Sequence, residues 1–328
     1  MIHLNRRYYL RGLYAAFRWM INPVSEGGAK QVPRARIYLT GPQILKDVEE
    51  MRQHPVGARL LRDKPDFGEA CQLKNLENMP EGSFGHAYYQ MMSAPGIAPA
   101  YLLAGLAYRD GFFDSIDMDE DTRWLLERGL FDHDPSHILS GYGTDLSGEM
   151  LNILYAQGLN GVPRWLAFAG PFGILSSIII PKVGWKEWRR LLKEAYRRGA
   201  QARAHFPPQA YPYEELFPRP LSEVREYLGI EPLPEGFSTA GWLNGSFLGR
   251  KFATGFAPPK KKGKSKAKHN AQKEEEPKPD VPALSQLVID RGVHWRDFMR
   301  AGKECQERLR ELAASGASSE RLQAELSN

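Results

Sequence analysis

Helical segments separated by glycine and proline occupy this chain of 328 residues up to about residue 245. Within the segments, apolar residues recur every three or four positions, which is the period of an amphipathic helix. A half-buried strand would instead alternate apolar and polar residues between turn signals, and the sequence has no sustained run of that kind. The sequence therefore predicts an all-α fold, a multi-helix globular domain. The expected helices are Tyr8–Met20, Pro42–Arg52, Ser83–Met92, Ala98–Arg109, Asp119–Arg128, His133–Leu139, Ser147–Gln157, Trp165–Ile180, Trp185–Ala204 and Ser222–Leu228.

The composition changes after residue 255. Residues 258–268 begin with proline and are then rich in lysine, and three glutamates follow at 274–276. A polar segment with so few apolar side chains cannot offset the entropy that it would lose on ordering. We therefore expect a helical domain at 1–250, a disordered linker at 256–282 and a C-terminal helical extension at 283–328. No aromatic side chains accompany the lysines, so a nucleic-acid partner is not expected.

Cysteine content and apolar runs limit the class of protein further. Cys71 and Cys305 are far apart, which does not suggest a disulfide framework and favours a reducing compartment. The basic and aromatic residues 1–20 lack the apolar centre of a signal peptide, and either a mitochondrial presequence or an ordinary first helix would fit them. The most apolar run, Trp165–Ile180, is interrupted by Pro171 and is shorter than the about 20 residues of a spanning helix. It is expected to be buried or interfacial.

Metal-ligand side chains gather in residues 132–149. His133 and His137 are four positions apart and would project from one face of a helix, with Asp134 between them. Glu149 follows a segment that contains three glycines. Two imidazoles with one or two carboxylates can make a divalent-metal site that keeps open positions for water or substrate.

The same residues also fit a purely structural interpretation. Asp134 would be the N-cap of a helix whose first turn contains Pro135. His137 would then be a core histidine, and Glu149 would be a surface residue near the start of the next helix. In that case His133 lies at the very start of the helix, and the two histidines need not share a face.

A basic amphipathic stretch lies at 185–203. It combines arginines and lysines with tryptophan, leucine and tyrosine beside the most apolar run of the chain. Such a helix suits an anionic membrane surface, although an ordinary solvated face is the alternative. The expected membrane-surface residues are Arg189, Arg190, Arg197 and Arg198.

The pattern His133-Asp134-x-x-His137, followed after eleven residues by Glu149, resembles the signature of the coenzyme Q biosynthesis protein 4 family. Residues 79–85, Met-Pro-Glu-Gly-Ser-Phe-Gly, resemble the Leu-Pro-Glu-Gly-Thr-Phe-Gly loop of that family. The resemblance covers roughly residues 37 to 235. Two features depart from the family pattern: Pro135 replaces an apolar helical residue, and the tail from about residue 256 lies outside the family domain. Further matching segments are 54–57 (His-Pro-Val-Gly), 167–171 (Ala-Phe-Ala-Gly-Pro) and 213–215 (Tyr-Glu-Glu).

The resemblance implies a role in ubiquinone biosynthesis. The implied reaction is metal-dependent C1 oxidative decarboxylation and hydroxylation of a prenylated benzoate-type precursor, by a lyase or oxidative decarboxylase. A non-catalytic lipid-binding scaffold that organises the biosynthetic complex is the alternative, so whether the chain is an enzyme stays open here.

The resemblance also implies a divalent metal held by His133, Asp134, His137 and Glu149, with Asp134 as ligand or proton-relaying catalytic residue. Zinc is implied by the family, but the mixed nitrogen and oxygen donors leave manganese and iron open. Because zinc has no redox chemistry, dioxygen or a partner's cofactor would have to supply the oxidant.

A prenylated substrate needs an apolar binding site. The apolar residues that could line such a site could equally form an ordinary helical core. The partners implied are the prenylated aromatic precursor, other ubiquinone biosynthesis proteins and an anionic membrane surface, with a homodimer left open. The implied location is peripheral, on the cytoplasmic face of a bacterial inner membrane or the matrix side of the mitochondrial inner membrane. The expected lipid-binding residues are Leu151, Leu154, Phe168 and Ile174.

Overall fold

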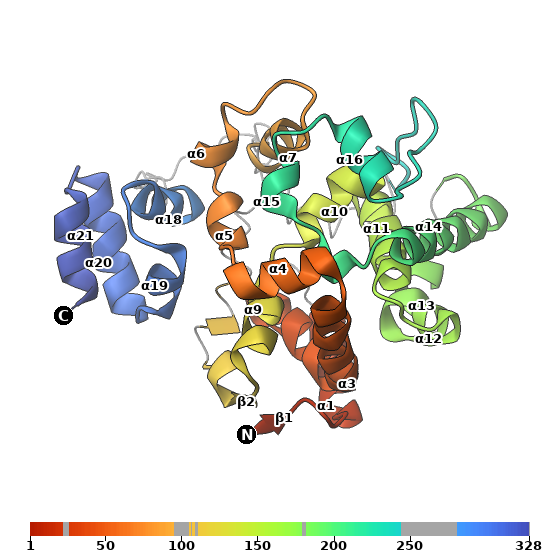
Figure 1. The fold of residues 1–328 in the computed structure, drawn as a ribbon, viewed down its shortest axis with the longest axis horizontal. Coiled ribbons are helices and arrows are strands. Elements are labelled where there is room, and N and C mark those ends of the chain that lie inside the picture. The colour runs from red at the N-terminus through yellow and green to blue at the C-terminus, as the bar shows by residue number, and fades with distance from the viewer. Residues whose placement is uncertain are drawn as a thin grey trace, which may run out of the picture.

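Helices make up most of the fold, so the predicted all-α class is confirmed (Figure 1). A computed structural model describes residues 1–21, 26–94, 105, 107–108, 111–178, 182–243 and 281–327. The strands β1 (Ile2–His3) and β2 (Ile116–Asp117) are two residues long and pair in parallel. They join the start of the chain to the segment before α9.

The helices of the first half of the chain are α1 Tyr9–Ile21, α2 Glu26–Ala29, α3 Gln31–Gln53, α4 Pro55–Asp63, α5 Phe67–Ala70, α6 Leu73–Leu76, α7 Phe84–Met92 and α9 Glu120–Arg128, with a 3₁₀ turn η1 at Phe113–Ser115. The later helices are α10 His133–Ser140, α11 Leu146–Leu159, α12 Arg164–Ala169, α13 Pro171–Ile178, α14 Trp185–His205, α15 Tyr213–Leu216 and α16 Leu221–Tyr227, with η2 at Pro208–Ala210. The C-terminal helices are α18 Val281–Asp290, α19 Trp295–Arg300, α20 Lys303–Ala314 and α21 Ser319–Leu326.

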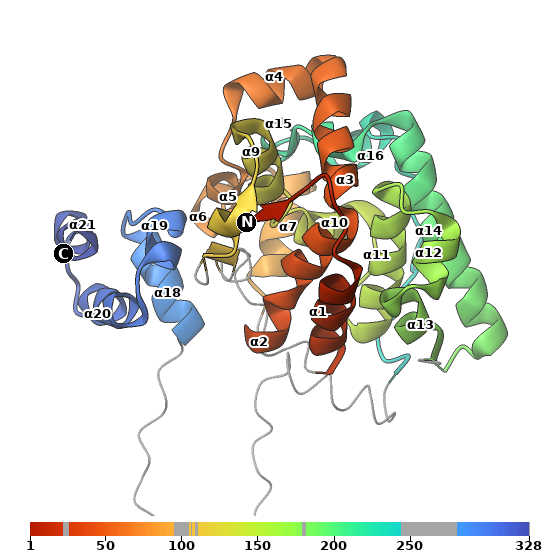
Figure 2. The same ribbon diagram turned by 90° about the horizontal axis from the view of Figure 1, so that it is seen from below.

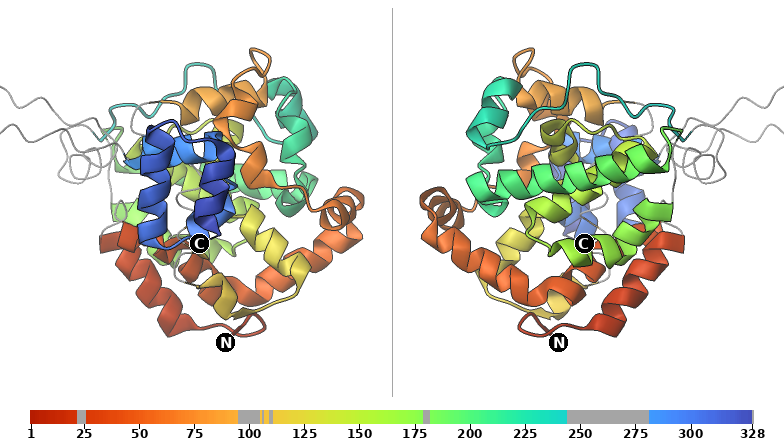
Figure 3. Two further views of the ribbon diagram at one scale, coloured as in Figure 1. Left: turned by 90° about the vertical axis from the view of Figure 1, so that its left-hand side faces the viewer. Right: turned by 90° about the vertical axis from the view of Figure 1, so that its right-hand side faces the viewer.

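The helices α11 and α14 pack against each other at the centre of the domain, and α14 runs across one side of the molecule (Figure 3, right). Their backbones meet at two glycines. A Cβ atom on Gly158 would lie 2.1 Å from the Tyr196 carbonyl oxygen, and one on Gly199 would lie 2.0 Å from that of Tyr155. Only glycine allows so close an approach.

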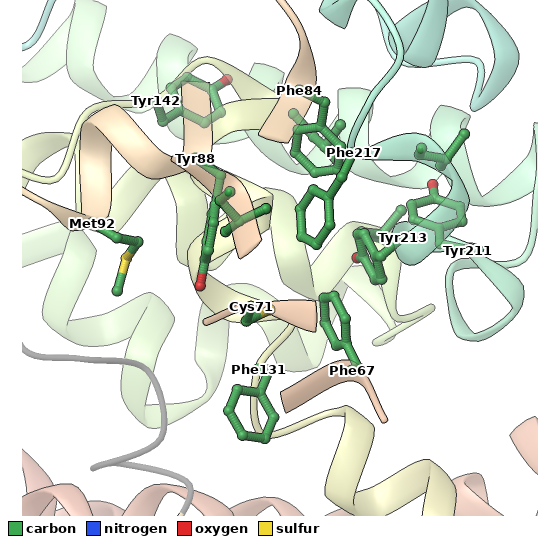
Figure 4. Packing of buried hydrophobic residues seen from close by; sticks show 14 of the residues in the cluster. Phe67, Cys71, Phe84, Tyr88, Met92, Phe131, Tyr142, Tyr211, Tyr213 and Phe217 are labelled. Carbon is green, nitrogen blue, oxygen red and sulfur yellow. The ribbon is translucent and has the colours of Figure 1, made fainter. Parts of the chain in front are cut away.

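Aromatic side chains from distant segments fill the core beside this pair. Figure 4 shows Phe84, Phe217, Tyr213 and Phe67 following one another between α7, α15 and α5. The rings of Phe67 and Tyr213 stack with centroids 4.6 Å apart, and those of Phe84 and Phe217 are 5.1 Å apart. The contact between Phe84 and Phe217 joins the start of α7 to the end of α15.

The helix expected at Pro42–Arg52 begins earlier, because α3 passes through Pro42. Proline has no N–H, so the carbonyl of Tyr38 loses its helical donor. The backbone N–H of Tyr8 donates to that carbonyl at 2.8 Å and replaces the missing bond. The helix expected at Trp165–Ile180 instead divides at Gly170 into α12 and α13.

Two further differences from the expected helices concern α4 and the segment Ala98–Arg109. The helix α4 was not among the helices expected from apolar spacing, although residues 54–57 resemble an early helix and turn of the family; His54 caps it by accepting from the N–H of Gly57 at 3.4 Å. The helix expected at Ala98–Arg109 lies outside the described residues, apart from 105, 107 and 108.

The C-terminal helices form a group on one side of the domain (Figure 1, Figure 3). Trp295 is fully buried and its ring meets that of Phe131 edge-on at 5.0 Å. A Cβ atom on Gly68 would lie 2.6 Å from the indole nitrogen, so this position must be small. The linker expected at 256–282 lies outside the described residues, except for the two that begin α18.

Both cysteines, Cys71 and Cys305, are free thiols. Within the described ranges, no helix combines the length and the apolar character needed to cross a membrane.

Candidate metal centre

The helices α10 and α11 place the candidate ligands. The helix α10 starts at His133 and stops at Gly141, whose φ of 81° is left-handed and favours glycine. The helix α11 starts after Asp145, whose carboxylate accepts from the N–H of Ser147 at 3.0 Å. This N-cap holds the first turn of α11, which carries Glu149.

A glycine contact and a buried amide fix the distance between α10 and α11. A Cβ atom on Gly148 would lie 2.1 Å from the Gly143 carbonyl oxygen, so the first turn of α11 touches the preceding loop through main-chain atoms. Further along, the amide of the buried Asn152 donates to the hydroxyl of Ser136 at 2.8 Å and accepts from the hydroxyl of Ser140 at 3.0 Å. Because these bonds run from one helix to the other in the protein interior, they favour a single arrangement of α10 and α11.

Three side chains converge between these helices. Nε2 of His133 lies 3.2 Å from one carboxylate oxygen of Glu149, and Nε2 of His137 lies 3.1 Å from the other. The two nitrogens are 3.3 Å apart. The three candidate ligand atoms lie within 4.8 Å of one another.

The backbone sets the tautomer of His137. Its Nδ1 lies 3.1 Å from the carbonyl oxygen of Tyr142, so in the neutral ring Nδ1 carries the proton and donates it. Nε2 is then an unprotonated acceptor that faces a carboxylate oxygen. Two acceptors at this distance repel each other unless a proton or a cation lies between them.

The spacing of the donors fits a divalent cation. Ligands about 2.0–2.1 Å from a tetrahedral ion lie about 3.3 Å apart, close to the separations seen here. The orienting bond from His137 to a backbone carbonyl is the kind that metal-bound histidines usually make. The donor set alone does not choose the metal.

The site is buried on one side and open on the other. His137 is buried, whereas the side chain of His133 is 45% exposed and that of Glu149 is 29% exposed. Desolvation raises the pKa of Glu149, but the neighbouring histidines outweigh it and hold that pKa well below its usual value. Desolvation lowers the pKa of His133, and Glu149 with the nearby aspartates reverses the effect and raises it. Such strong mutual effects are common at functional sites.

Asp134 lies beside this group without being part of it. The converging set in the described chain is His133, His137 and Glu149. Asp134 is not the N-cap either, because α10 already begins at His133. Burial raises the pKa of its carboxyl group.

The structure shows that His133 lies on the helix in spite of Pro135. His133 is the first residue of α10 and shares a face with His137, their ring centroids being 4.9 Å apart. Pro135 fits the first turn, where its missing N–H costs nothing.

The four expected lipid-binding residues occupy different environments. Leu151 and Leu154 are fully buried in the core beside the α11–α14 contact. Phe168 is partly buried and packs against that core, whereas Ile174 is exposed.

The expected membrane-surface arginines of α14 are also placed differently from one another. Arg198 is buried rather than at the surface: it donates to the carbonyls of Ser140, at 3.0 Å, and Glu231. Arg190 pairs with the glutamate three residues earlier at 2.6 Å, and Arg197 pairs with two glutamates. Arg189 lies over the ring of Trp185 at 5.1 Å.

Sequence reasoning missed several residues that build the site. Arg225 donates to the carbonyls of Ile138 at 2.7 Å and Leu139 at 3.0 Å, and with Arg198 it satisfies the end of α10. Asn152 was also missed, although its position three residues after Glu149 places it on the adjoining face of α11.

Comparisons with known proteins identify the family. A model described as coenzyme Q (ubiquinone) biosynthesis protein Coq4 matches residues 35–234. The rat protein named ubiquinone biosynthesis protein COQ4 homolog, mitochondrial, is 28% identical over 200 residues, which cover 60% of this chain and 69% of the relative. The human protein of the same name is 27% identical over 199 residues, with 60% and 69% covered. Ubiquinone biosynthesis protein COQ4, mitochondrial, of Yarrowia lipolytica is 27% identical over 194 residues, with 58% and 68% covered.

The solved structure of a Nostoc punctiforme PCC 73102 protein has a TM-score of 0.48 to this chain at 20% identity, covering 68% of this chain and 98% of its own. The match at residues 35–234 spans more than half of the chain and contains both helices of the candidate metal centre. The chain therefore belongs to the coenzyme Q (ubiquinone) biosynthesis protein Coq4 family and has a role in ubiquinone biosynthesis.

Proposed function

We propose that this protein catalyses the C1 oxidative decarboxylation and hydroxylation of a prenylated benzoate-type quinone precursor, using a divalent metal. The observation that carries the proposal is the convergence of His133, His137 and Glu149 within 4.8 Å in a member of a ubiquinone biosynthesis family. A bound cation can orient the carboxylate of an aromatic acid and stabilise the negative charge that develops as the carboxylate leaves.

His133, His137 and Glu149 would hold the ion. When bound, the ion supplies Lewis-acid chemistry toward the carboxylate and phenolate oxygens of the precursor. Three protein ligands leave at least one position free, and the exposed side of His133 gives access to it. That openness favours a catalytic metal over a closed structural one.

Asp134 would handle protons next to the ion. Because burial raises the pKa of its carboxyl group, Asp134 is suited to hold a proton and release it during the reaction. The exchange of a carboxylate for a hydroxyl is an oxidation, and we propose dioxygen or a partner's cofactor as the oxidant. Zinc is the proposed metal, with manganese and iron as alternatives.

We further propose that the protein works with other proteins of the pathway at an anionic membrane surface. The rat, human and Yarrowia relatives are named as mitochondrial proteins, which favours a mitochondrial over a bacterial location. A prenylated precursor is a lipid, so an enzyme that acts on it must meet a membrane.

The test replaces Glu149 with Gln, or His137 with Ala, in cells that depend on this protein, and profiles quinone intermediates by mass spectrometry. Accumulation of a carboxylated prenyl-phenol supports the enzyme. The matched control is Glu187→Gln, which removes an exposed carboxylate of α14 and should leave the profile unchanged. Normal ubiquinone with well-expressed Glu149 and His137 variants would reject catalysis and favour the lipid-binding scaffold.

A further inference from the structure

The helix α1 buries its small residues and exposes most of its large apolar ones, Trp19 being partly buried against the core. Gly12, Ala15 and Ala16 are buried, and a Cβ atom on Gly12 would lie 2.5 Å from the side chain of Leu39 on α3. Leu10, in contrast, is 85% exposed. A helix that only packs on a globular domain places its large apolar side chains inward. The helix α1 therefore has an apolar surface that its own domain does not use.

The large exposed residues share one side of α1. Leu10, Leu13, Tyr14, Phe17 and Ile21 are all exposed, Phe17 by 58%. Their spacings of three, four, seven and eleven residues from Leu10 place them along one stripe of a helix with 3.6 residues per turn. We call these five residues the α1 face.

Arginines border the α1 face and have no acidic neighbours. Arg6, Arg7, Arg11 and Arg18 are exposed, and in the described ranges no carboxylate pairs with any of them. Their contacts are aromatic instead: the guanidinium of Arg11 lies 5.6 Å from the centre of a tyrosine ring, and that of Arg18 lies 6.0 Å from another. The helix α1 itself contains no acidic residue.

A second exposed apolar region lies on helices next to α1. The helices α1 and α13 are in contact and lie side by side in Figure 2, with α12 next to α13. On α12, Trp165 is 71% exposed and Leu166 is also exposed, and Ile174 is exposed on α13. Arg164, also exposed, precedes the tryptophan. Two segments far apart in the sequence thus bring the same combination of apolar and cationic groups to neighbouring positions.

We propose that the α1 face, together with the exposed side of α12 and α13, lies on an anionic phospholipid bilayer. Large apolar side chains would enter the acyl boundary, and the bordering arginines would meet lipid phosphates. This deepens the membrane association proposed above, but it rests on α1 and not on the metal centre. Vesicle binding therefore tests the membrane proposal, and the quinone profile tests the catalytic proposal, so that either can be rejected without the other.

Charge favours a bilayer over a second copy of the chain. A dimer formed through the α1 face would bring Arg11 and Arg18 of both copies together, and α1 has no carboxylate to neutralise them. An anionic bilayer supplies negative charge along the whole membrane-facing side of the helix. The basic helix α14 is a poorer candidate, because Arg190 and Arg197 are already paired with glutamates.

The test is flotation of the full chain with vesicles of phosphatidylcholine alone or mixed with cardiolipin. The wild type should float with the mixed vesicles only. The Arg11→Gln, Arg18→Gln double variant should lose on the order of 25-fold in partition coefficient, about fivefold for each arginine. Replacing Leu10 and Phe17 by serine should cost at least about tenfold for each side chain. All four residues are exposed, so the variants should fold, which circular dichroism checks.

Matched controls use side chains elsewhere on the surface. Arg189→Gln with Arg190→Gln tests charge on α14, and Leu45→Ser removes an exposed apolar side chain of α3. Both controls should bind like the wild type. Wild-type-like flotation of either α1 variant would overturn the proposal, as would equal binding to neutral vesicles. A wild type that does not float but forms a dimer in light scattering, lost on changing Leu10 and Phe17, would assign the face to a second copy.

Discussion

Asp66 holds the C-terminal helices on the domain, and its charge can be removed without changing its shape. One carboxylate oxygen lies 3.1 Å from Nε2 of His294 and 3.3 Å from a guanidinium nitrogen of Arg296. The other oxygen caps α5 by accepting from the N–H of Glu69 at 2.9 Å. Asp66→Asn keeps an oxygen for the cap and loses the negative charge that faces α19.

The pKa of Asp66 gives the size of the effect. Desolvation raises this pKa, but the bonds from His294 and Glu69 and the charge of Arg296 lower it from 3.8 to about 2. A difference of nearly two units corresponds to about 2 kcal/mol of stability. Because the pKa is lower in the folded state, this stabilisation is complete above about pH 4 and is lost as the pH falls toward 2.

Urea unfolding of the wild type and Asp66→Asn tests the magnitude. We expect a gap of about 2 kcal/mol at about pH 6, and roughly half of it at about pH 3. Hydrogen exchange of α18–α21 should rise in the variant. Asp114→Asn is the control: its exposed carboxylate pairs with Arg123 at 3.4 Å and should contribute little. Equal stability at pH 6, or a gap that stays constant with pH, would refute the reasoning.

Three further predictions concern the candidate metal centre. Removing zinc with a chelator should lower the Tm of the wild type but not that of Glu149→Gln, which lacks a charged ligand; equal shifts would exclude Glu149 as a ligand. Gly148→Ala should cost about 3 kcal/mol in urea unfolding, because its Cβ would lie 2.1 Å from a carbonyl oxygen, and a loss below about 1 kcal/mol would mean that the loop can move. Asn152→Ala should cost about 1–3 kcal/mol, because the buried hydroxyl of Ser140 loses its acceptor and that of Ser136 loses its donor, and an unchanged unfolding midpoint would contradict this.

The candidate ligands were predictable because their relation is local. A spacing of four residues puts His133 and His137 on one face of any helix, and a capped helix start brings Glu149 back toward them. The bridge from Asn152 to α10 was not predictable in the same way. Asparagine in a helix carries no periodic signal, and its partners are set only when two helices pack.

Arg198 and Pro42 show where sequence patterns mislead. Arg198 belongs to a basic helical pattern, but its guanidinium satisfies carbonyls at the end of α10, which the pattern cannot show. Pro42 predicts a helix start, but α3 continues because a distant N–H, that of Tyr8, bonds the vacated carbonyl. In both cases the deciding partner lies far away in the sequence.

The contact between Gly148 and Gly143 has a consequence for how the site exchanges metal. Main-chain atoms, rather than packed side chains, set the separation between the turn that bears Glu149 and the loop that follows α10. This main-chain contact does not involve the ion, whereas the folding of a zinc finger depends on its ion. One ion could then replace another while the domain stays folded. The metal bound in the cell would therefore depend on which metals are available after folding, and not only on which metal is present when the chain folds.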